Sequence, residues 1–452
     1  MFCDFRFPAF CRIPHKDARD RFGGYSLRCD LVNALSVFLA AALALVGGVD
    51  AVSAEQPLFS SAQELAVPAG KGAREPALSA MPDGRVVLSW TEPAGQGFAV
   101  RVALGNAKGW SEPRTVVESP KLFVNWADFP SAIALPDGRL VAHWLKENGE
   151  SSYAYDVNIA LSSDEGRSWG AALVPHRDGT ERQHGFVSLV AIDAQRFMAI
   201  WLDGRNYGSS VSFAADESTT DAMQLRATIV GADGSLSEET LLDARTCTCC
   251  QTSATRTDSG KMLVVYRDRT EDEIRDIAIL RSVDGVWSEP QTINRDGWNI
   301  AGCPVNGPAI DSAAARVAVA WFTAADDVPK VKVAFSDDDG DSFGSAIAID
   351  QGNPTGRVDV LQLGDGSALV SWLEQTVAGE AVYLCQVTAL EGCREPTVLT
   401  VSRQGRTIGF PRMVQVGADI YIAWTAPGGD RSASPDDDVQ LRVVVARLGD
   451  QP

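Results

Sequence analysis

The stretch EPALSAMPDGRVVLSW, residues 75–90, sets a pattern that recurs along the chain. It consists of a short apolar segment, a tight turn at Pro82-Asp83-Gly84, a second apolar segment and a closing tryptophan. Asp-Gly in such a turn supplies the left-handed backbone position that a tight hairpin requires. We therefore predict that residues 75–90 form a β-hairpin.

Six further copies of this pattern follow, and each ends in an aromatic residue: Trp144, Trp201, Tyr266, Trp321, Trp372 and Trp424. A second hairpin follows the first in each of the first six units. Four strands in a unit of about 50 residues are typical of a β-propeller blade. We predict an all-β propeller of four-stranded blades, seven in number, with six as the alternative if one divergent unit is an elaboration. Separate β-sandwiches would need linkers, and no composition shift divides the units.

The seventh unit ends after its third strand, VQLRVVVARL at 439–448. A segment without a partner, FSSAQELAV at 59–67, precedes the first unit. We predict that this N-terminal segment supplies the missing outer strand. Such closure of the ring would protect the edge of the last blade.

The N-terminus has the features of a targeting segment. Residues 32–49 are uncharged and apolar, and Ala51-Val52-Ser53-Ala54 then offers a small-residue cleavage site. We predict a signal peptide with an extended leader over 1–54, translation from nearer Leu31, and a single propeller domain over 55–452. The protein is then exported, periplasmic or secreted. A membrane anchor is the alternative, since 18 apolar residues can just span a bilayer.

The composition excludes several classes of protein. Hydrophobic residues make up 45% and charged residues 22%, which excludes wholesale disorder. Acidic residues outnumber basic ones 59 to 40, for a formal net charge of −19. This charge argues against a nucleic-acid partner, because such binding relies on Lys and Arg that neutralise phosphates. No second apolar run could span a membrane once the signal is removed, and we expect a monomer.

Two turns share a specific pattern, S-x-D-x-G-x-S-aromatic, at 162–169 (SSDEGRSW) and 336–343 (SDDDGDSF). The Asp carboxylate can accept hydrogen bonds from amides of its own turn, Gly allows a positive φ, and the aromatic ring packs beneath. The pattern predicts structural roles for three pairs of residues: Asp164 and Asp338, Gly166 and Gly340, Trp169 and Phe343.

These turns resemble the Asp-box of the sialidase (BNR-repeat) superfamily, and the blade repeats extend the resemblance over most of 57–452. The resemblance implies a substrate carboxylate held by three Arg, a Tyr nucleophile assisted by a Glu, and an Asp acid/base. Sialidases carry their first Arg in an Arg-Ile-Pro motif. Arg74-Glu75-Pro76 occupies that position here, with Glu75 in place of Ile.

Polar residues at the starts of the predicted innermost strands are the site candidates, because these strands begin near the propeller axis. We predict that Arg74, Arg357 and Arg412 bind a carboxylate, because the planar guanidinium suits two parallel hydrogen bonds. Asp128 is the predicted acid/base. The ligand is then an acidic glycan or another small anion. Residues 91–97 contain no Asp and no Tyr begins an inner strand, so exo-sialidase hydrolysis and binding alone both stay open.

Six cysteines follow residue 54, and an even number in an exported protein suggests disulfides. Cys385 and Cys393 flank one hairpin turn, and we predict a disulfide between them. Cys247, Cys249, Cys250 and Cys303 form two disulfides in one interpretation. In the other, Cys249, Cys250, Cys303 and His184 bind Cu(I) or Zn²⁺. The alternative function is thus a non-enzymatic binding propeller with a metal or redox site near the axis, and a third possibility is a scaffold that binds partners through its rim.

Overall fold

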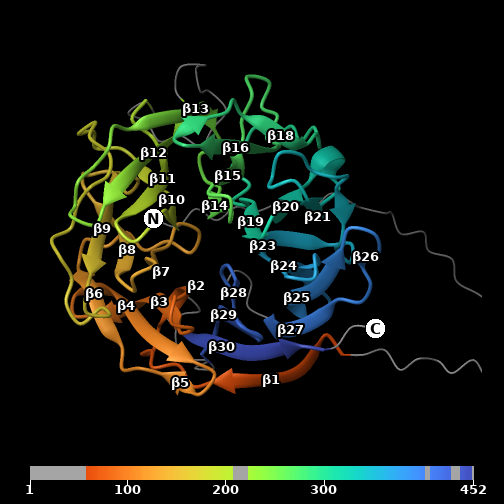
Figure 1. Ribbon diagram of the computed structural model, residues 1–452, viewed down its shortest axis with the longest axis horizontal. Coiled ribbons are helices and arrows are strands. Elements are labelled where there is room, and N and C mark those ends of the chain that lie inside the picture. Colours follow the sequence, from red (N-terminus) through yellow and green to blue (C-terminus); the bar gives the residue numbers. More distant parts are fainter. Residues whose placement is uncertain (1–56, 207–221, 403–407, 429–437, 450–452) are drawn as a thin grey trace, which may run out of the picture. The chain divides into compact units, whose positions relative to one another are not determined.

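The computed structural model describes residues 57–206, 222–402, 408–428 and 438–449. Within these residues, seven small antiparallel sheets surround a common axis (Figure 1). The domain is therefore a seven-bladed β-propeller, as the repeat predicts, and the six-bladed alternative is excluded. The predicted signal peptide at 1–54 lies outside the described residues.

The first two strands of each blade form the predicted hairpins. The innermost strands of blades 1 to 7 are β2 (Arg74–Ala80), β7 (Ser131–Ala134), β10 (His184–Ala191), β14 (Ser253–Arg256), β19 (Ala309–Ala313), β23 (Pro354–Gln362) and β28 (Arg412–Val416). The second strands are β3 (Val86–Ala94), β8 (Leu140–Glu147), β11 (Arg196–Asp203), β15 (Met262–Arg267), β20 (Arg316–Thr323), β24 (Ala368–Thr376) and β29 (Asp419–Pro427).

The outer half of each blade is less regular. The third strands are β4 (Gly97–Asn106), β9 (Tyr155–Ser162), β12 (Met223–Gly231), β16 (Ile277–Val283), β21 (Lys330–Ser336), β25 (Gly379–Thr388) and β30 (Val439–Leu448). The outermost strands are β5 (Gly109–Trp110) with β6 (Arg114–Ser119), β13 (Thr240–Thr246), β17 (Val286–Trp287) with β18 (Gln291–Asn294), β22 (Ile347–Ala348), β26 (Gly392–Cys393) with β27 (Thr397–Ser402), and β1 (Phe59–Leu65). Blade 2 has the bridge between Ile159 and Leu173 in place of a fourth strand, and η1 (Ala325–Asp327) joins β20 to β21.

The closing aromatic of each repeat lies in the second strand of its blade and is at most 5% exposed. Second strands have a neighbour on each side and pack against the adjacent blades through both faces. β20 shows the result, since every residue after Arg316 in this strand is buried. Continuous apolar runs in the sequence therefore mark these strands, as expected for strands buried on both faces.

The ring closes as the sequence predicts, through pairing of β1 with β30 (Figure 1). The pairing is antiparallel, with Leu65 opposite Val443 and Ala62 opposite Ala446. The Gly449 amide also donates to the Leu58 carbonyl at 3.0 Å. One blade thus contains both ends of the domain, which removes an open sheet edge.

The two turns at 162–169 and 336–343 have the same internal hydrogen bonds. In the first, Ser162 Oγ accepts from the Gly166 amide at 2.7 Å and donates to Asp164 at 2.8 Å. Asp164 also accepts from the amide and hydroxyl of Ser168. The hydroxyl and amide of Ser168 lower the pKa of Asp164 to about 2. These contacts fit the structural role predicted for both turns.

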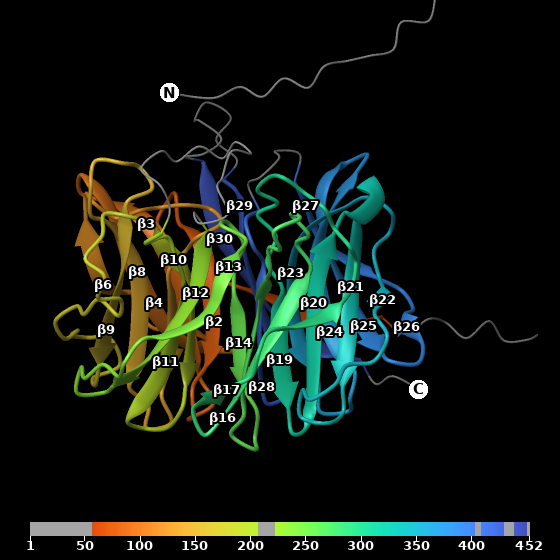
Figure 2. The ribbon, with the colours of Figure 1, turned by 90° about the horizontal axis from the view of Figure 1, so that it is seen from above.

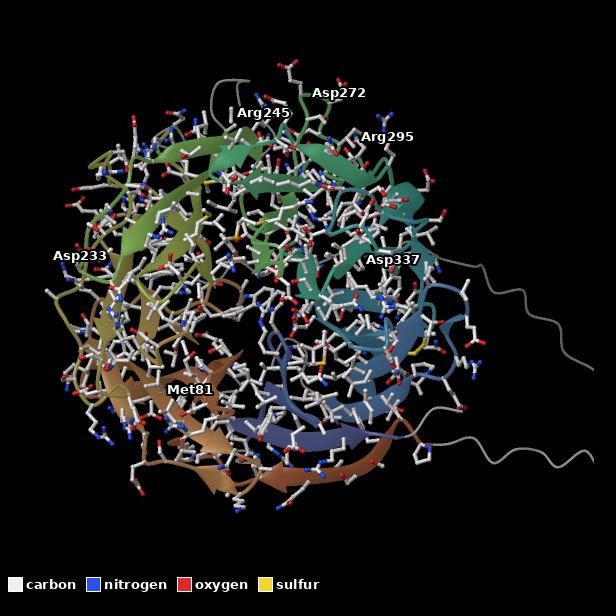
Figure 3. The ribbon with its side chains drawn as sticks, viewed as in Figure 1. Met81, Asp233, Arg245, Asp272, Arg295 and Asp337 are labelled. Carbon is white, nitrogen blue, oxygen red and sulfur yellow. A yellow bond between two sulfur atoms is a disulfide. The ribbon has the colours of Figure 1, made fainter. Side chains whose placement is uncertain are left out.

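The loops gather at the two faces between which the strands run (Figure 2). Charged side chains such as Asp233, Asp272 and Arg295 lie at the outer rim (Figure 3). Among the described residues, no helix has the length and apolar character to cross a membrane.

Removal of β1 tests ring closure. We expect a chain of residues 68–452 to lose several kcal/mol in unfolding free energy relative to 57–452, because each ladder hydrogen bond contributes about 0.5–1.5 kcal/mol. Urea denaturation measures the loss, and a 57–67 peptide added in trans should restore part of it. A Leu65→Asp peptide is the control that should not. Equal denaturation midpoints for the two chains would contradict the closure.

Candidate functional site

The inner strands start with an unusual backbone geometry. Glu75, Phe186, Val305 and Arg357 all have φ between 49° and 58°, in the left-handed region that non-glycine residues rarely adopt. The register of the inner hairpin shifts at three of these places, in β2, β10 and β23. A bulge of this kind redirects side chains, and bulges are over-represented next to functional sites.

Side chains of neighbouring blades hold this geometry in place. The Phe186 amide donates to Asp128 Oδ1 at 2.7 Å, and the Arg357 amide donates to Asn306 Oδ1 at 2.8 Å. The Glu75 amide donates to Thr425 Oγ1 at 3.1 Å across the closing junction. Asp128, predicted as an acid/base, therefore ties blade 2 to blade 3 through its carboxyl group.

Two of the three predicted arginines meet in one cluster near the axis. The Arg357 guanidinium lies 4.7 Å from the ring centre of Trp126 and 5.9 Å from that of Phe410. The Arg412 guanidinium lies 5.0 Å from the ring centre of Phe129. Phe410 contacts both Trp126 and Phe129, with ring centres 5.9 and 5.8 Å apart. We call these five residues the axial cluster.

Carboxylates accompany both arginines of the axial cluster. Arg357 Nη1 lies 3.7 Å from Glu380 and donates to the Gly409 carbonyl. Arg412 Nη1 lies 3.5 Å from Asp359, and Arg412 keeps about a quarter of its side chain exposed. Burial raises the pKa of Asp359, although Arg412 opposes this.

Arg74 has different contacts. Its Nε donates to the Gly72 carbonyl at 3.0 Å, and its guanidinium lies 5.9 Å from the ring centre of Phe98. Its role as a third carboxylate ligand stays a prediction.

Two buried carboxyl groups lie at the starts of blades 1 and 2. Burial raises the pKa of Glu75 to about 8, against the opposing charge of Arg74. Burial also raises the pKa of Asp128 to about 7, although the Phe186 amide and the Tyr155 hydroxyl favour its ionised form. Carboxylic acids that keep a proton near neutral pH can act as general acids.

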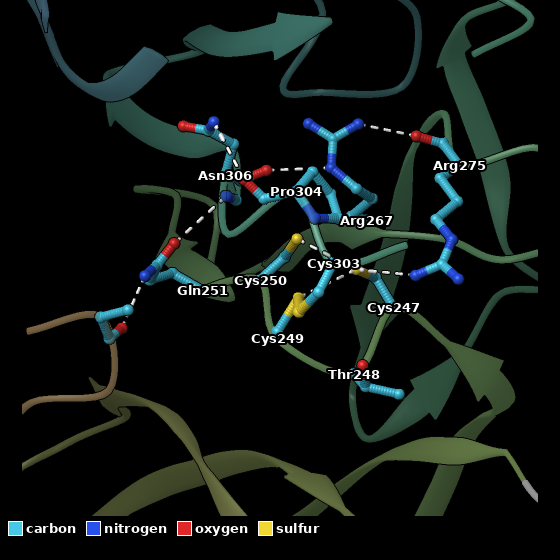
Figure 4. Close-up of a disulfide and its surroundings, with 12 residues drawn as sticks. Cys247, Thr248, Cys249, Cys250, Gln251, Arg267, Arg275, Cys303, Pro304 and Asn306 are labelled. Atoms are coloured by element: carbon cyan, nitrogen blue, oxygen red, sulfur yellow. Dashed lines mark hydrogen bonds between the residues drawn. A yellow bond between two sulfur atoms is a disulfide. The ribbon is translucent and has the colours of Figure 1, made fainter. Parts of the chain in front are cut away.

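Cys247, Cys249 and Cys250 lie in the loop between β13 and β14, and Cys303 lies in the loop before β19; Figure 4 shows the four side chains together. Cys249 and Cys303 form a disulfide, and Cys385 and Cys393 form the disulfide predicted for blade 6. Cys247 and Cys250 are free thiols with their sulfur atoms 3.0 Å apart.

An arginine faces the first of these thiols. Arg275 Nη1 donates to Cys247 Sγ at 3.5 Å. Burial raises the pKa of the Cys247 thiol, but hydrogen bonding from Cys250 and the charge of Arg275 prevail and lower it to about 6. Burial and the neighbouring sulfur raise the pKa of Cys250.

Among the described residues, the potential metal ligands near His184 are Asp156, His176, Asp178 and Asp203. The cysteines form a separate group. Sequence reasoning missed His176, Asp178 and the aromatic residues of the axial cluster. Trp126 and Phe410 lie in the loops just before β7 and β28. Their closeness in sequence to the start of an inner strand is the feature by which the sequence could have indicated them.

No family model matches the chain, and no curated protein matches it. Solved structures similar to it include a protein of unknown function from Dyadobacter fermentans, with 15% identity over 86% of this chain and 99% of that one, at a TM-score of 0.48. A Hadza microbial sialidase has 12% identity over 78% and 74%, at a TM-score of 0.45. An α-L-arabinofuranosidase from Fusarium graminearum has 12% identity over 87% and 99%, at a TM-score of 0.48.

The raised pKa of Glu75 makes stability depend on pH. Between about 4.5 and about 8, the folded state holds a proton that the unfolded state has lost, so this group lowers stability as pH rises. We expect Glu75→Gln to remove that decline. The unfolding free energy of the variant minus that of the wild type should then increase with pH, by at most about 1.4 kcal/mol per pH unit. Urea titrations at pH 5, 6.5 and 8 measure the difference. The exposed Glu112→Gln control should show a constant difference, and a constant difference for Glu75→Gln would contradict the prediction.

Proposed function

We propose that this protein binds an acidic carbohydrate on the face where the inner strands begin, through the axial cluster. The observation that carries the proposal is the convergence of Arg357 and Arg412 on one set of aromatic rings. These residues come from loops and strands of blades 2, 6 and 7, so the site requires the closed ring.

The chemistry of the cluster suits a sugar that carries a carboxylate. Ligand sites combine aromatic walls with a few placed polar groups, and Arg binds carboxylates with charge-assisted hydrogen bonds. Arg412 is the arginine better able to reach a ligand, because its side chain is more exposed than that of Arg357. A sugar ring would lie against Trp126 or Phe129, both of which are partly exposed.

Hydrolysis is the finer form of this proposal. Asp128 and Glu75 can hold a proton at neutral pH, as the acid of a glycosidase must. Sialidase-type hydrolysis, with Asp128 as acid/base, is the hydrolytic form that the sequence leaves open beside binding alone. Export to an oxidising compartment belongs to the same proposal, since two disulfides persist there.

Calorimetric titration with sialyllactose, trigalacturonic acid and neutral lactose tests the proposal. We expect at least one acidic sugar to bind more tightly than lactose, and Arg412→Ala to weaken it roughly 10- to 100-fold, the effect of losing a hydrogen bond to a charged group. Arg196→Ala, at the opposite end of a blade 3 strand, is the matched control. Equal affinity for acidic and neutral sugars would refute the proposal. So would an Arg412→Ala variant that binds the acidic sugar as tightly as the wild type. Release of the fluorophore from a fluorogenic sialoside separates hydrolysis from binding alone.

The free thiols favour a second candidate function, thiol–disulfide exchange. Cys247 and Cys250 have the C-x-x-C spacing of redox motifs, and Cys247 has a lowered pKa. Both thiols are buried, so the exchange requires local opening of their loop. Exchange with an external disulfide would form a Cys247–Cys250 disulfide and reduce the external disulfide to two thiols, so that two electrons and two protons move together.

Alkylation kinetics test this candidate. We expect Cys247 to react with iodoacetamide with an apparent pKa of about 6, and Arg275→Gln to raise that pKa because it removes a stabilising positive charge. Arg295→Gln, an exposed arginine, should leave the profile unchanged. A Cys247 profile with the ordinary thiol pKa would rule the candidate out, and so would an Arg275→Gln variant identical to the wild type.

A further inference from the structure

One short loop contacts four different blades near the axis. Residues 125–129, which we call the axial loop, lie between the outermost strand of blade 1 and the innermost strand of blade 2. Four successive residues of this loop each meet another blade: Trp126 lies against Arg357 of blade 6, Ala127 bonds to Gln251 at the start of blade 4, Asp128 bonds to Phe186 of blade 3, and Phe129 lies against Arg412 of blade 7.

The carbonyl group in the middle of the axial loop is held by the side chain of Gln251. Gln251 Nε2 donates to the Ala127 oxygen at 2.6 Å, although blade 3 separates the two segments in the ring. Gln251 Oε1 accepts from the Gly307 amide at 3.2 Å, in the loop before blade 5 (Figure 4). One side chain thus joins the segments at which blades 2, 4 and 5 start.

Burial leaves Gln251 one arrangement. Gln251 is 7% exposed and Ala127 4%, so polar groups here need partners within the protein. Gly307 lies so close that a Cβ atom at this position would be 2.0 Å from the main-chain oxygen of Gln251. Glycine is therefore needed for the close approach that brings the Gly307 amide to the Gln251 side chain.

The bond to Ala127 orients the aromatic residues on either side of it. The peptide unit that follows Ala127 is planar, so a fixed carbonyl oxygen also fixes the direction in which the chain continues to Phe129. On the other side, Asn125 Oδ1 accepts from the Ala127 amide at 2.9 Å, which closes a turn around Trp126. The position of Ala127 therefore sets how both rings face the arginines of the axial cluster.

The disulfide between Cys249 and Cys303 joins the two segments that Gln251 bridges. Cys249 lies two residues before Gln251, and Cys303 lies three residues before Asn306. Asn306 Oδ1 accepts from the Arg357 amide at 2.8 Å. The disulfide therefore fixes a support of the axial loop beside a support of Arg357.

We propose that Gln251 is a positioning residue of the axial cluster, and that the Cys249–Cys303 disulfide holds Gln251 in place. Gln251 acts through the axial loop and not through contact with a ligand, because both polar ends of its side chain are engaged. The inference rests on the proposed carbohydrate site, whose aromatic walls Gln251 would orient.

Hydrogen–deuterium exchange of the ligand-free full chain tests the positioning without any sugar. Gln251→Met keeps the length of the side chain and removes both hydrogen bonds. We expect it to speed exchange in peptides that cover 123–130 about 2- to 10-fold, the factor that corresponds to one net hydrogen bond. Unchanged exchange in these peptides would overturn the proposal.

Gln362→Met is the matched control. Gln362 is also buried, and its Nε2 also donates to main-chain oxygens, those of Leu363 and Ser367. These bonds lie at the opposite end of an inner strand, in the hairpin turn after β23. The control variant should lose stability without faster exchange in peptides that cover 123–130.

Calorimetric titration then measures the consequence for binding, at a temperature where both variants are folded. The probe is sialyllactose or trigalacturonic acid, whichever the wild type binds more tightly. We expect Gln251→Met to bind it about 2- to 10-fold more weakly and Gln362→Met to bind it as the wild type does. Lower melting temperatures with unchanged affinities for both variants would show a role in stability alone and overturn the proposal. Absence of binding to the wild type would refute the proposed function, and the exchange experiment would still decide the role of Gln251.

The disulfide supplies a second variant in case Gln251→Met does not fold. Cys249→Ser with Cys303→Ser should also speed exchange in peptides that cover 123–130, because it frees the segment that carries Gln251. Cys385→Ser with Cys393→Ser, which removes the disulfide of blade 6, is the control that should not. Exchange at 123–130 that is equal in both double variants and the wild type would overturn the proposal.

Discussion

Hydrogen bonds from side chains to main-chain groups of the next blade hold the inner strands in register around the axis. Ser79, Asp128, Ser253, Asn306, Asp359 and Thr425 make such bonds across six junctions, and Thr252 makes one to the Phe186 carbonyl across the seventh. Five of these side chains accept from main-chain amides, and Ser79 and Thr252 donate to main-chain carbonyls, so these groups are not left without partners. The inner strands around the axis therefore have a fixed geometry, and the candidate sites at their starts depend on it.

This constraint explains why the polar residues near the axis divide into two groups. Asp128 and Asn306 use their side chains to join blades, while Arg357 and Arg412 project towards the aromatic rings of the axial cluster. The same constraint keeps carboxyl groups buried, which is the largest cause of the raised pKa of Glu75 and Asp128. A framework of this kind can position ligand-binding groups without large rearrangement.

The sequence predicts the fold because its signals are local. Hairpin turns, continuous apolar second strands and a closing aromatic recur in each blade, and the unpaired segment 59–67 matches the missing strand of the last blade. The site is harder to predict, because its contacts join distant segments. Arg357 meets Trp126 across the axis through the packing of blades, and Arg275 meets Cys247, which lies 28 residues earlier in the chain. Asp178 is close in sequence to His176 and His184, but their loop carries no repeat signal.

Hydrogen–deuterium exchange of the protein with and without a saturating acidic trisaccharide tests the central claim, a carbohydrate site at the axial cluster, most directly. We predict slower exchange in peptides that cover 123–130, 354–360 and 408–414, with no change in the turns at 162–169 and 336–343. Protection confined to the rim, or no protection at concentrations that saturate binding, would contradict an axial carbohydrate site.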